Sequence, residues 1–309
     1  MARLTIILPA LGSDTQLEET LVSVLQNRPD DSDVLVVHPG NYDDPYELAG
    51  EVNFLPMPAG SGLLACLNAA IQGADSDLLH ILAPGVEVEE GWTDVALTRF
   101  HNRLVAAVAP TCSIGSVSQS TQIQGRTTAW AGAARNCAPG EAALGPAWWA
   151  SFYRTQAVVD AGGFDNEIGS SLADLDLALT LRRLGYRTES ESASRVSLKD
   201  IPVIDQPTPW ESARAAERFH RRHGADQGWF GAWCGYPMAI ASEMLSGVMP
   251  IAGRIAGWME GSEPAQRYEA RIAELPKAVA PEMPRIVKYE ARGARKATPS
   301  ASSGQRKAA

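Results

Sequence analysis

The sequence is poor in cysteine, and the cysteines that it has are scattered. The four lie far apart and form no CxxC pair: Cys66, Cys112, Cys137 and Cys234. Structural zinc sites and disulfide frameworks need closely or regularly spaced cysteines, so neither is expected to hold this fold together. This usage of cysteine is typical of a protein in a reducing compartment.

Long apolar runs are also missing. The most apolar part of the chain, residues 229–258, is interrupted by Glu243, Pro250 and Arg254, and the longest charge-free run there, Gly228 to Ser242, has 15 residues. A helix that spans a membrane needs roughly 20 apolar residues in succession. We therefore expect buried helices or a homo-oligomer contact in this segment, with peripheral attachment to a membrane as the alternative.

Basic residues are outnumbered by acidic ones. The chain has 27 Lys and Arg against 36 Asp and Glu, a formal net charge of -9. Nucleic-acid binding needs clustered positive charge to neutralise phosphates, so no nucleic acid is expected as a partner. Residues 285–309 differ from this average, because they contain seven basic residues and one acid among small polar residues. We predict a disordered tail there.

The first residues, MARLTIILPALGSD, contain only a short apolar run, which Pro9 interrupts. A signal peptide normally has a longer apolar region followed by a small-residue cleavage site, so this run is interpreted as a first strand. We expect a cytoplasmic protein, and any peripheral attachment is expected at the inner face of the membrane.

Apolar runs alternate with amphipathic segments through the first hundred residues. Strands are expected at Leu4–Leu8, Asp33–Val37, Val52–Leu55, Leu78–Leu82 and Leu104–Ala109. Residues 13–27 place Leu17, Leu21 and Val24 on one helical face, and residues 61–71 repeat the pattern. This alternation predicts an α/β fold with a mostly parallel central sheet and helices on both faces.

The pattern loosens beyond residue 110. The polar segment from Thr111 to Asn136 is too long for an ordinary connection, which indicates a functional loop or strand region. Helices are predicted from Ser171 to Gly185 and from Pro209 to Gly224. We divide the chain into a main domain, an apolar helical extension and the basic tail, covering residues 1–225, 226–284 and 285–309.

Three familiar kinds of site are weakly supported. GSGLLA, from Gly60 to Ala65, matches a dinucleotide-binding fingerprint, but the next strand tip, Ala83-Pro84-Gly85, has no acid for the ribose. His220 and His223 have a metal-chelating spacing, yet they lie among arginines at a helix C-terminus, where cations are stabilised without a metal. No G-x-S-x-G elbow is present for a serine nucleophile.

Asp174 and Asp176 are the remaining candidates. They lie two residues apart on a predicted helix, which separates their directions by about 200°. They therefore cannot both face one ligand. One of them is available for chemistry, while capping of the helix start and the helix dipole are the alternative explanation for either.

Five stretches taken together resemble the family 2 glycosyltransferases in their order and spacing, from about Leu4 to Arg187. They are LTIILPALGSDTQLEETLVSVLQN, VLVVHPGNYDD, GLLACLNAAIQGADSDLLHILAPGVEVEEGW, FYRTQAVVDAGGFD and LADLDLALTLRRLGYR. The resemblance implies a GT-A-like fold and a nucleotide-sugar donor. It also implies inverting transfer of the sugar to a hydroxyl of a glycan or lipid-linked acceptor.

The resemblance also assigns roles to single residues. Asp174 falls on the acid that similar enzymes use as general base, a role that suits removal of the acceptor proton during inverting transfer. Residues implied to contact the donor are Pro9, His38, Asp43, Asn68 and Gly85. Aromatic or basic residues expected at the acceptor are Trp148, Trp149 and Arg154, and Gly163, Phe164 and Asp165 match the family's G-G-F-D.

The sequence departs from the family at its acids. His38-Pro39 stands where an acidic pair is usual, Ala83-Pro84-Gly85 replaces the metal-binding acid-x-acid, and Ala173 replaces the acid before the base. A leaving diphosphate needs positive charge, usually Mg²⁺ or Mn²⁺, but the usual ligands are absent, so no cofactor is assigned. His38 or Arg154 is considered as a replacement cation, and Glu87 as a replacement ligand.

Two hypotheses about function follow. The first is a glycosyltransferase with little or no metal dependence and Asp174 as its base. The second is a catalytically degenerate relative that binds a glycan, a nucleotide or a partner protein, because a fold alone does not fix a function.

Overall fold

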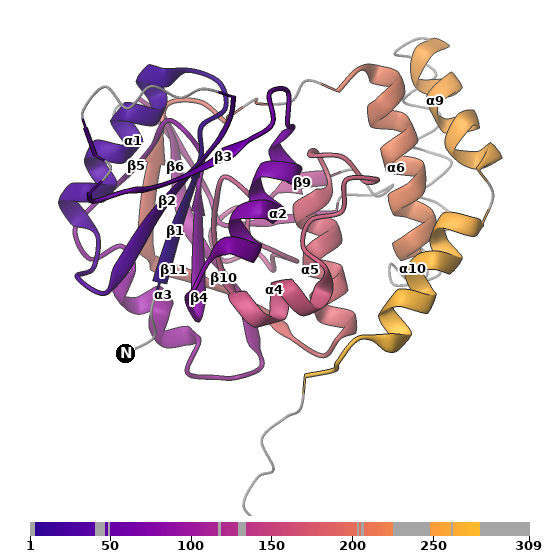
Figure 1. Ribbon diagram of the computed structural model, residues 1–309. Helices are drawn as coiled ribbons and strands as arrows, with labels where there is room; N and C mark the ends of the chain where they lie inside the picture. The colour runs from indigo at the N-terminus through magenta and orange to yellow at the C-terminus, as the bar shows by residue number, and fades with distance from the viewer. Residues whose placement is uncertain are drawn as a thin grey trace, which may run out of the picture.

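The computed structural model describes residues 4–40, 47–48, 50–116, 119–128, 134–202, 204, 207–224, 248–260 and 262–278. A central sheet of nine strands has helices on both faces, and the later helices line one side of it (Figure 1). This is the α/β architecture that the sequence predicts.

The first half of the sheet is parallel. Its strands lie in the order β3-β2-β1-β4. Their bounds are Leu4–Pro9 for β1, Ser32–Pro39 for β2, Asn53–Met57 for β3 and Leu78–Leu82 for β4. Helices α1 (Asp14–Asn27) and α2 (Leu63–Gly73) connect them. Every residue of β1 and β4 is buried, because helices cover both faces, and this explains their continuous apolar sequences.

The second half of the sheet is mixed. Strand β10 (Ala150–Arg154) runs antiparallel between β4 and β6 (Val105–Ser116), and β11 (Arg187–Leu198) lies parallel to β6. Strand β5 (Val86–Val88) pairs with β11 and is the outermost strand on this side of the sheet. The mostly parallel sheet that the sequence predicts is therefore confirmed for the first four strands, while the antiparallel β10 was not expected.

The polar segment after residue 110 folds into short strands. β7 (Gln119–Ile123) forms a hairpin with β6, and β8 (Arg126–Thr128) pairs with β9 (Ala134–Asn136) in a separate two-stranded sheet. Gly125 and Gly145 allow this small sheet to lie close to the main domain. A Cβ on Gly125 would lie 2.7 Å from the Gly145 carbonyl oxygen, and a Cβ on Gly145 would meet the Ala178 side chain at 2.5 Å.

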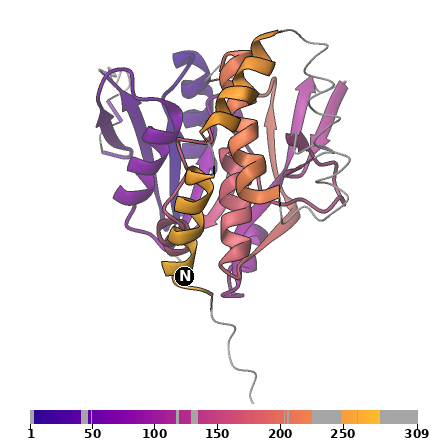
Figure 2. The ribbon, with the colours of Figure 1, turned by 90° about the vertical axis from the view of Figure 1, so that its right-hand side faces the viewer.

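Six further helices complete the described chain. Their bounds are Asp94–Arg99 for α3, Thr155–Ala161 for α4, Ala173–Arg183 for α5, Pro209–His223 for α6, Val248–Met259 for α9 and Glu263–Glu274 for α10. Helices α6, α9 and α10 lie together on the side of the molecule that Figure 2 faces. Helix α6 begins with a capping box between Thr208 and Glu211, which agrees with its predicted start.

The C-terminal helices are attached to the main core. Tyr268 and Ile272 of α10 are buried in the same hydrophobic cluster as the central strands. Helix α9 turns large apolar side chains outward, with Val248, Trp258 and Met259 each more than 60% exposed. No helix in the described parts of the chain is long and apolar enough to cross a membrane. The predicted boundary at residue 225, most of the segment 229–258 and the tail 285–309 lie outside the described residues.

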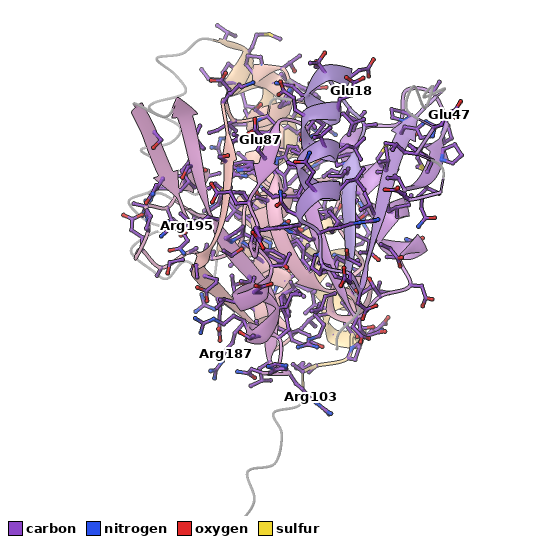
Figure 3. All side chains as sticks on the ribbon, turned by 90° about the vertical axis from the view of Figure 1, so that its left-hand side faces the viewer. Glu18, Glu47, Glu87, Arg103, Arg187 and Arg195 are labelled. Atoms are coloured by element: carbon purple, nitrogen blue, oxygen red, sulfur yellow. The ribbon has the colours of Figure 1, made fainter. Side chains whose placement is uncertain are left out.

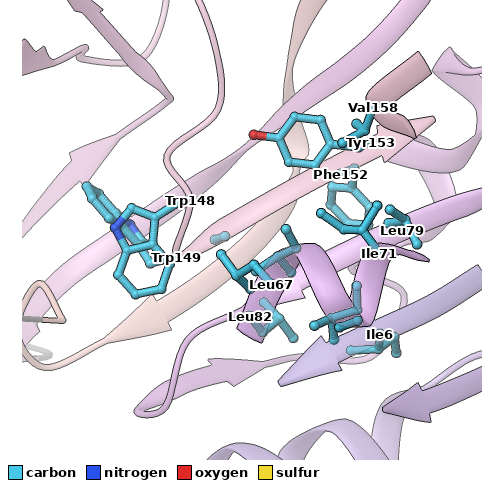
Figure 4. Close-up of a cluster of buried hydrophobic side chains, with 14 of the residues drawn as sticks. Ile6, Leu67, Ile71, Leu79, Leu82, Trp148, Trp149, Phe152, Tyr153 and Val158 are labelled. Atoms are coloured by element: carbon cyan, nitrogen blue, oxygen red, sulfur yellow. The ribbon is translucent and has the colours of Figure 1, made fainter. Parts of the chain in front are cut away.

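His80 lies at the centre of the main core, which Figure 4 shows in part. Its ring stacks on Phe152 with centroids 3.6 Å apart. Trp92 Nε1 donates to its Nε2 at 3.0 Å, so the proton is on Nδ1, which donates to the Ser151 carbonyl at 3.0 Å. Burial lowers the pKa of His80 to about 3, which keeps the ring neutral.

Candidate functional site

Three of the five predicted donor-binding residues lie at one end of the sheet. Strands β1, β2 and β4 are parallel, so Pro9, His38 and Gly85 all lie where these strands end. The carboxyl edge of an open α/β sheet is the usual place for a ligand. His38 is 8% exposed, and its Nδ1 lies 2.9 Å from the Gly40 carbonyl oxygen. Asp43, also predicted here, lies outside the described residues.

The tip of β4 is closed by helix α1. The backbone N–H of Gly85 donates to Thr20 Oγ1 at 2.9 Å and to the Gln16 carbonyl at 3.0 Å. Gly85 has a φ of +87°, which favours glycine and lets the chain turn sharply into β5. The tip therefore presents backbone and apolar atoms where the family has carboxylates.

The described residues at the tip of β4 do not form a metal site. Ala83-Pro84-Gly85 supplies no side-chain ligand, and Glu87 alone follows on β5 with an exposed side chain. Within the described ranges, no three His, Cys, Asp or Glu side chains lie close enough to hold an ion together. Mg²⁺ and Mn²⁺ need carboxylate or imidazole ligands from a protein. The described residues at the tip of β4 therefore do not fit a divalent cation.

Asn68 is committed to the G-G-F-D segment. Its Nδ2 donates to the Phe164 carbonyl at 2.7 Å, and its Oδ1 accepts from the Phe164 N–H at 2.8 Å. Gly163 has a φ of +74°, and a Cβ there would overlap Asn68 Oδ1. The structure therefore gives Asn68 a role in holding this loop against α2.

Trp148 and Trp149 precede β10 and reach the end of β4. The Trp149 carbonyl accepts from the Ala83 N–H at 2.9 Å, and the two indoles meet edge to face with centroids 6.3 Å apart. They are only 6% and 4% exposed, so their faces are covered by protein. The guanidinium of Arg126 lies 5.7 Å from the centroid of the Trp149 ring.

Asp174 is fully buried at the start of α5. Arg126 Nη1 lies 2.7 Å from both of its carboxylate oxygens. Oδ1 also accepts from the Leu175 N–H at 2.8 Å, and Oδ2 accepts from the Trp148 N–H at 3.2 Å. The carboxylate is thus an ion-pair partner as well as a backbone acceptor, and the helix cap itself, Leu172, makes no side-chain capping bond.

Asp176 points to a different part of the molecule, as its helical position predicts. It accepts from Arg222 Nη1 at 3.1 Å and from His223 Nε2 at 2.8 Å, both on α6. Arg222 also binds Asp165 of the G-G-F-D segment at 2.8 Å. Asp176 therefore joins α6 to the core. Of the two aspartates, only Asp174 faces the carboxyl end of the sheet.

Arg154 is not brought together with the other predicted residues. It pairs with Leu78 at the first residue of β4, whereas the site lies beyond the last. Its guanidinium donates to the carbonyls of Phe100 at 2.6 Å and Val105 at 3.2 Å. It lines a groove of about 1320 Å³ on that opposite edge, which is also lined by Asp30, Asp31, Asp75, Asp77 and Asp94. Arg154 was predicted at the acceptor, or as a replacement cation. Its position at the opposite end of β4 corrects that prediction.

Arg126 is the residue that sequence reasoning missed. It lies in the polar segment whose length indicated function, but nothing local connects it with Asp174, because the contact depends on the fold of β8 against α5. The available indication was an arginine directly after Gly125 in an otherwise uncharged run, QIQGRTT.

No family model matches this chain, and no curated protein matches its sequence. Solved structures do match. GalNAc-T7 with UDP, GalNAc and Mn²⁺ is 13% identical with a TM-score of 0.56, covering 74% of this chain and 51% of that one. This chain therefore spans about half the length of GalNAc-T7.

Two further solved structures are similar. The mannosyltransferase PcManGT from Pyrobaculum calidifontis, in complex with GDP-Man and Mn²⁺, is 16% identical with a TM-score of 0.51, covering 88% of this chain and 86% of that one. S. aureus TarS 1-349 is 14% identical with a TM-score of 0.52, covering 71% and 64%. At these identities the likeness shows the fold, which is GT-A-like.

Proposed function

We propose that this protein is a glycosyltransferase that uses a nucleotide-sugar donor. The observation that carries the proposal is the position of Asp174, a carboxylate near the end of β4 and the start of β10 at the carboxyl end of a GT-A-like sheet. The similar structures that contain UDP with GalNAc, or GDP-Man, support a donor of the nucleotide-sugar class.

The proposed reaction is inverting transfer with Asp174 as general base. Asp174 takes the proton of an acceptor hydroxyl while that oxygen forms a bond to the anomeric carbon. The bond from the anomeric carbon to the donor phosphate breaks, and its electron pair leaves with the nucleoside diphosphate. A glycan or lipid-linked hydroxyl is the proposed acceptor. Asp174 can act only when one of its oxygens is released from Arg126.

A second candidate is favoured by the burial of Asp174. The carboxylate has no exposed surface, and each oxygen accepts one bond from Arg126 and one from the backbone. A carboxylate so fully engaged suits a structural ion pair in a relative that binds a glycan, a nucleotide or a partner without catalysing transfer.

Nucleotide binding and transfer separate the two candidates. UDP- and GDP-sugars are titrated against the protein with EDTA or Mn²⁺ while the thermal unfolding midpoint is followed, because a ligand of the folded state raises it. Transfer and hydrolysis are then measured with the donor that binds. We expect Asp174→Asn to retain donor binding and lose transfer, with Asp160→Asn, a surface acid on α4 bonded to Gln156, as the matched control.

The possible results are distinct. Turnover retained by Asp174→Asn would remove Asp174 as the base. Donor binding without turnover, for every acceptor tested, would establish the second candidate. An unfolding midpoint that no nucleotide sugar moves would contradict donor binding altogether.

A further inference from the structure

We infer that Arg126 binds the diphosphate of the donor and supplies the positive charge that a metal would otherwise supply. The inference rests on the proposed function and names the residue that would neutralise the leaving group. It starts from the mismatch at β4, where Ala83-Pro84-Gly85 leaves the carboxyl edge without metal ligands. A diphosphate still needs a cation when it leaves.

The place of Arg126 is the first argument. Its guanidinium lies over the ring of Trp149, and the Trp149 carbonyl is hydrogen-bonded to the Ala83 N–H. Trp149 therefore connects Arg126 with the tip of β4, where the glycosyltransferases that the sequence resembles hold a metal with an acid-x-acid motif. It approaches from β8, while Asp174 approaches from α5, so base and cation meet at the same edge.

Arg126 has a hydrogen-bond donor to spare. Nη1 of Arg126 binds Asp174, and Nη2 donates to the Ser171 carbonyl at 3.1 Å. Nε is buried and has no hydrogen-bond partner among the described residues. A buried N–H left unpaired is costly, and an anion accepting from it would remove that cost. A guanidinium with Nε free is suited to phosphate, which it binds through two parallel donors.

The charge around this edge is the third argument. Figure 3 shows Glu18, Glu47 and Glu87 near one end of the molecule and Arg103 and Arg187 near the other. The end with the acids is the one where β5 follows the tip of β4. These three carboxylates repel a diphosphate, so its binding there needs a cation, and among the described residues the basic side chain paired with Asp174 is Arg126.

Sharing of Arg126 gives an order of binding. Before the donor arrives, Arg126 holds both oxygens of Asp174. When diphosphate oxygens compete for the same guanidinium, they weaken its hold on Asp174 and free an oxygen for the acceptor hydroxyl. The donor therefore binds first, and the base becomes available only when the leaving group is in place.

The test compares ligands with and without a diphosphate. Affinities of UDP, GDP, uridine and guanosine are measured by isothermal titration calorimetry in EDTA and again in Mn²⁺. We expect a diphosphate to bind at least about tenfold more tightly than its nucleoside, a difference set by charge-assisted hydrogen bonds. The affinity should be the same in EDTA and in Mn²⁺.

The variants separate binding from folding. Arg126→Gln alone leaves Asp174 unpaired, so the main variant is the double R126Q/D174N, which replaces the ion pair with two neutral amides. It should bind nucleosides as the wild type does and lose the preference for the diphosphate. Asp174→Asn should keep that preference. Arg135→Gln, in the neighbouring strand β9 with an exposed partner in Glu141, is the matched control and should keep it as well.

The outcomes distinguish the inference from the proposed function. If the folded double variant prefers the diphosphate as strongly as wild type does, Arg126 does not bind it, while the proposed function survives. If Mn²⁺ raises the affinity of the wild type tenfold or more, a metal supplies the charge, and the inference is overturned. If the wild type binds neither diphosphate, the inference and the proposed function fall together.

Discussion

Arg126 and Asp174 are 48 residues apart in the chain, yet one nitrogen of the guanidinium lies 2.7 Å from both oxygens of the carboxylate. The arginine side chain is 11% exposed and the aspartate side chain is fully buried. Each charge is therefore compensated mainly by the other, since little water reaches either of them. The stability of the fold and the proposed chemistry therefore depend on the same pair.

Breaking this pair from one side should be costly. Arg126→Gln leaves a buried carboxylate without its cation, and we expect a loss of about 3–5 kcal/mol in the free energy of unfolding. The double variant R126Q/D174N should recover much of that loss, because no charge remains buried. Urea denaturation of the wild type, both single variants and the double variant measures the coupling. A loss in the double variant equal to the sum of the two single losses would show that the pair is not energetically coupled.

His80 should make the protein sensitive to acid. Its pKa is lowered to about 3 in the folded state and is about 6.5 when unfolded, so the unfolded chain takes up a proton that the folded protein refuses. Stability is fully present above pH 6.5 and is lost as the pH falls toward 3. In that range the loss attributable to His80 approaches about 1.4 kcal/mol per pH unit.

His80→Gln is the variant that checks this dependence. A glutamine can accept from Trp92 and donate to the Ser151 carbonyl without titrating. Urea midpoints measured between pH 4 and pH 8 should fall less steeply on the acid side in the variant than in the wild type. Identical slopes would show that His80 does not set the acid sensitivity.

Alanine substitutions at Gly163 and Gly140 test whether Asn68 holds the G-G-F-D segment in place. Both have positive φ, of +74° and +86°, but only Gly163 faces a neighbour, since nothing lies within 4 Å of a Cβ on Gly140. Gly140→Ala should cost about 1–2 kcal/mol through backbone strain alone. Gly163→Ala should cost more, because Asn68 must move and its two hydrogen bonds to Phe164 weaken. Equal losses in thermal or urea unfolding would contradict a specific role for Asn68.

Tyr268 and Trp258 test whether the C-terminal helices belong to the folded core. Tyr268 is 3% exposed and its hydroxyl lies 2.9 Å from Thr180 Oγ1, whereas Trp258 is 63% exposed. Tyr268→Ala should cost about 3–5 kcal/mol, and Trp258→Ala should change stability by less than about 0.5 kcal/mol. A small effect of Tyr268→Ala would mean that α10 can detach without loss to the main domain.

The sequence predicted the parallel part of the fold because that information is local. The bounds of β4 were predicted to the residue, since LLHIL is a short apolar run between the polar residues 75–77 and the turn Ala83-Pro84-Gly85. Strand β10 was not assigned, because its placement between β4 and β6 depends on partners 44 or more residues away in the chain. Pattern reasoning detects periodicity within a window and does not detect such long-range pairing.

The positions of several candidate residues in the fold could be predicted for the same reason. Pro9, His38, Gly85 and Asp174 lie at one edge, because the order of parallel strands fixes where their ends meet. Trp148 and Trp149 also reach this edge, but their burial could not be deduced from their sequence. Arg154 was misplaced because the direction of β10 was unknown, and an antiparallel strand puts its last residue at the opposite edge.

The two aspartates of α5 restrict how the site can open. Asp176 is held by Arg222 and His223 on one side of the helix, while Asp174 faces Arg126 on another. Rotation of α5 about its axis to expose Asp174 would break the bonds from Asp176 to Arg222 and His223. These bonds therefore oppose such a rotation. Strand β8 pairs with β9 and forms a bridge from Arg126 to Gly145, and it is not a strand of the main sheet. Asp174, the proposed base, therefore becomes accessible when Arg126 moves away, while Asp174 itself stays in place.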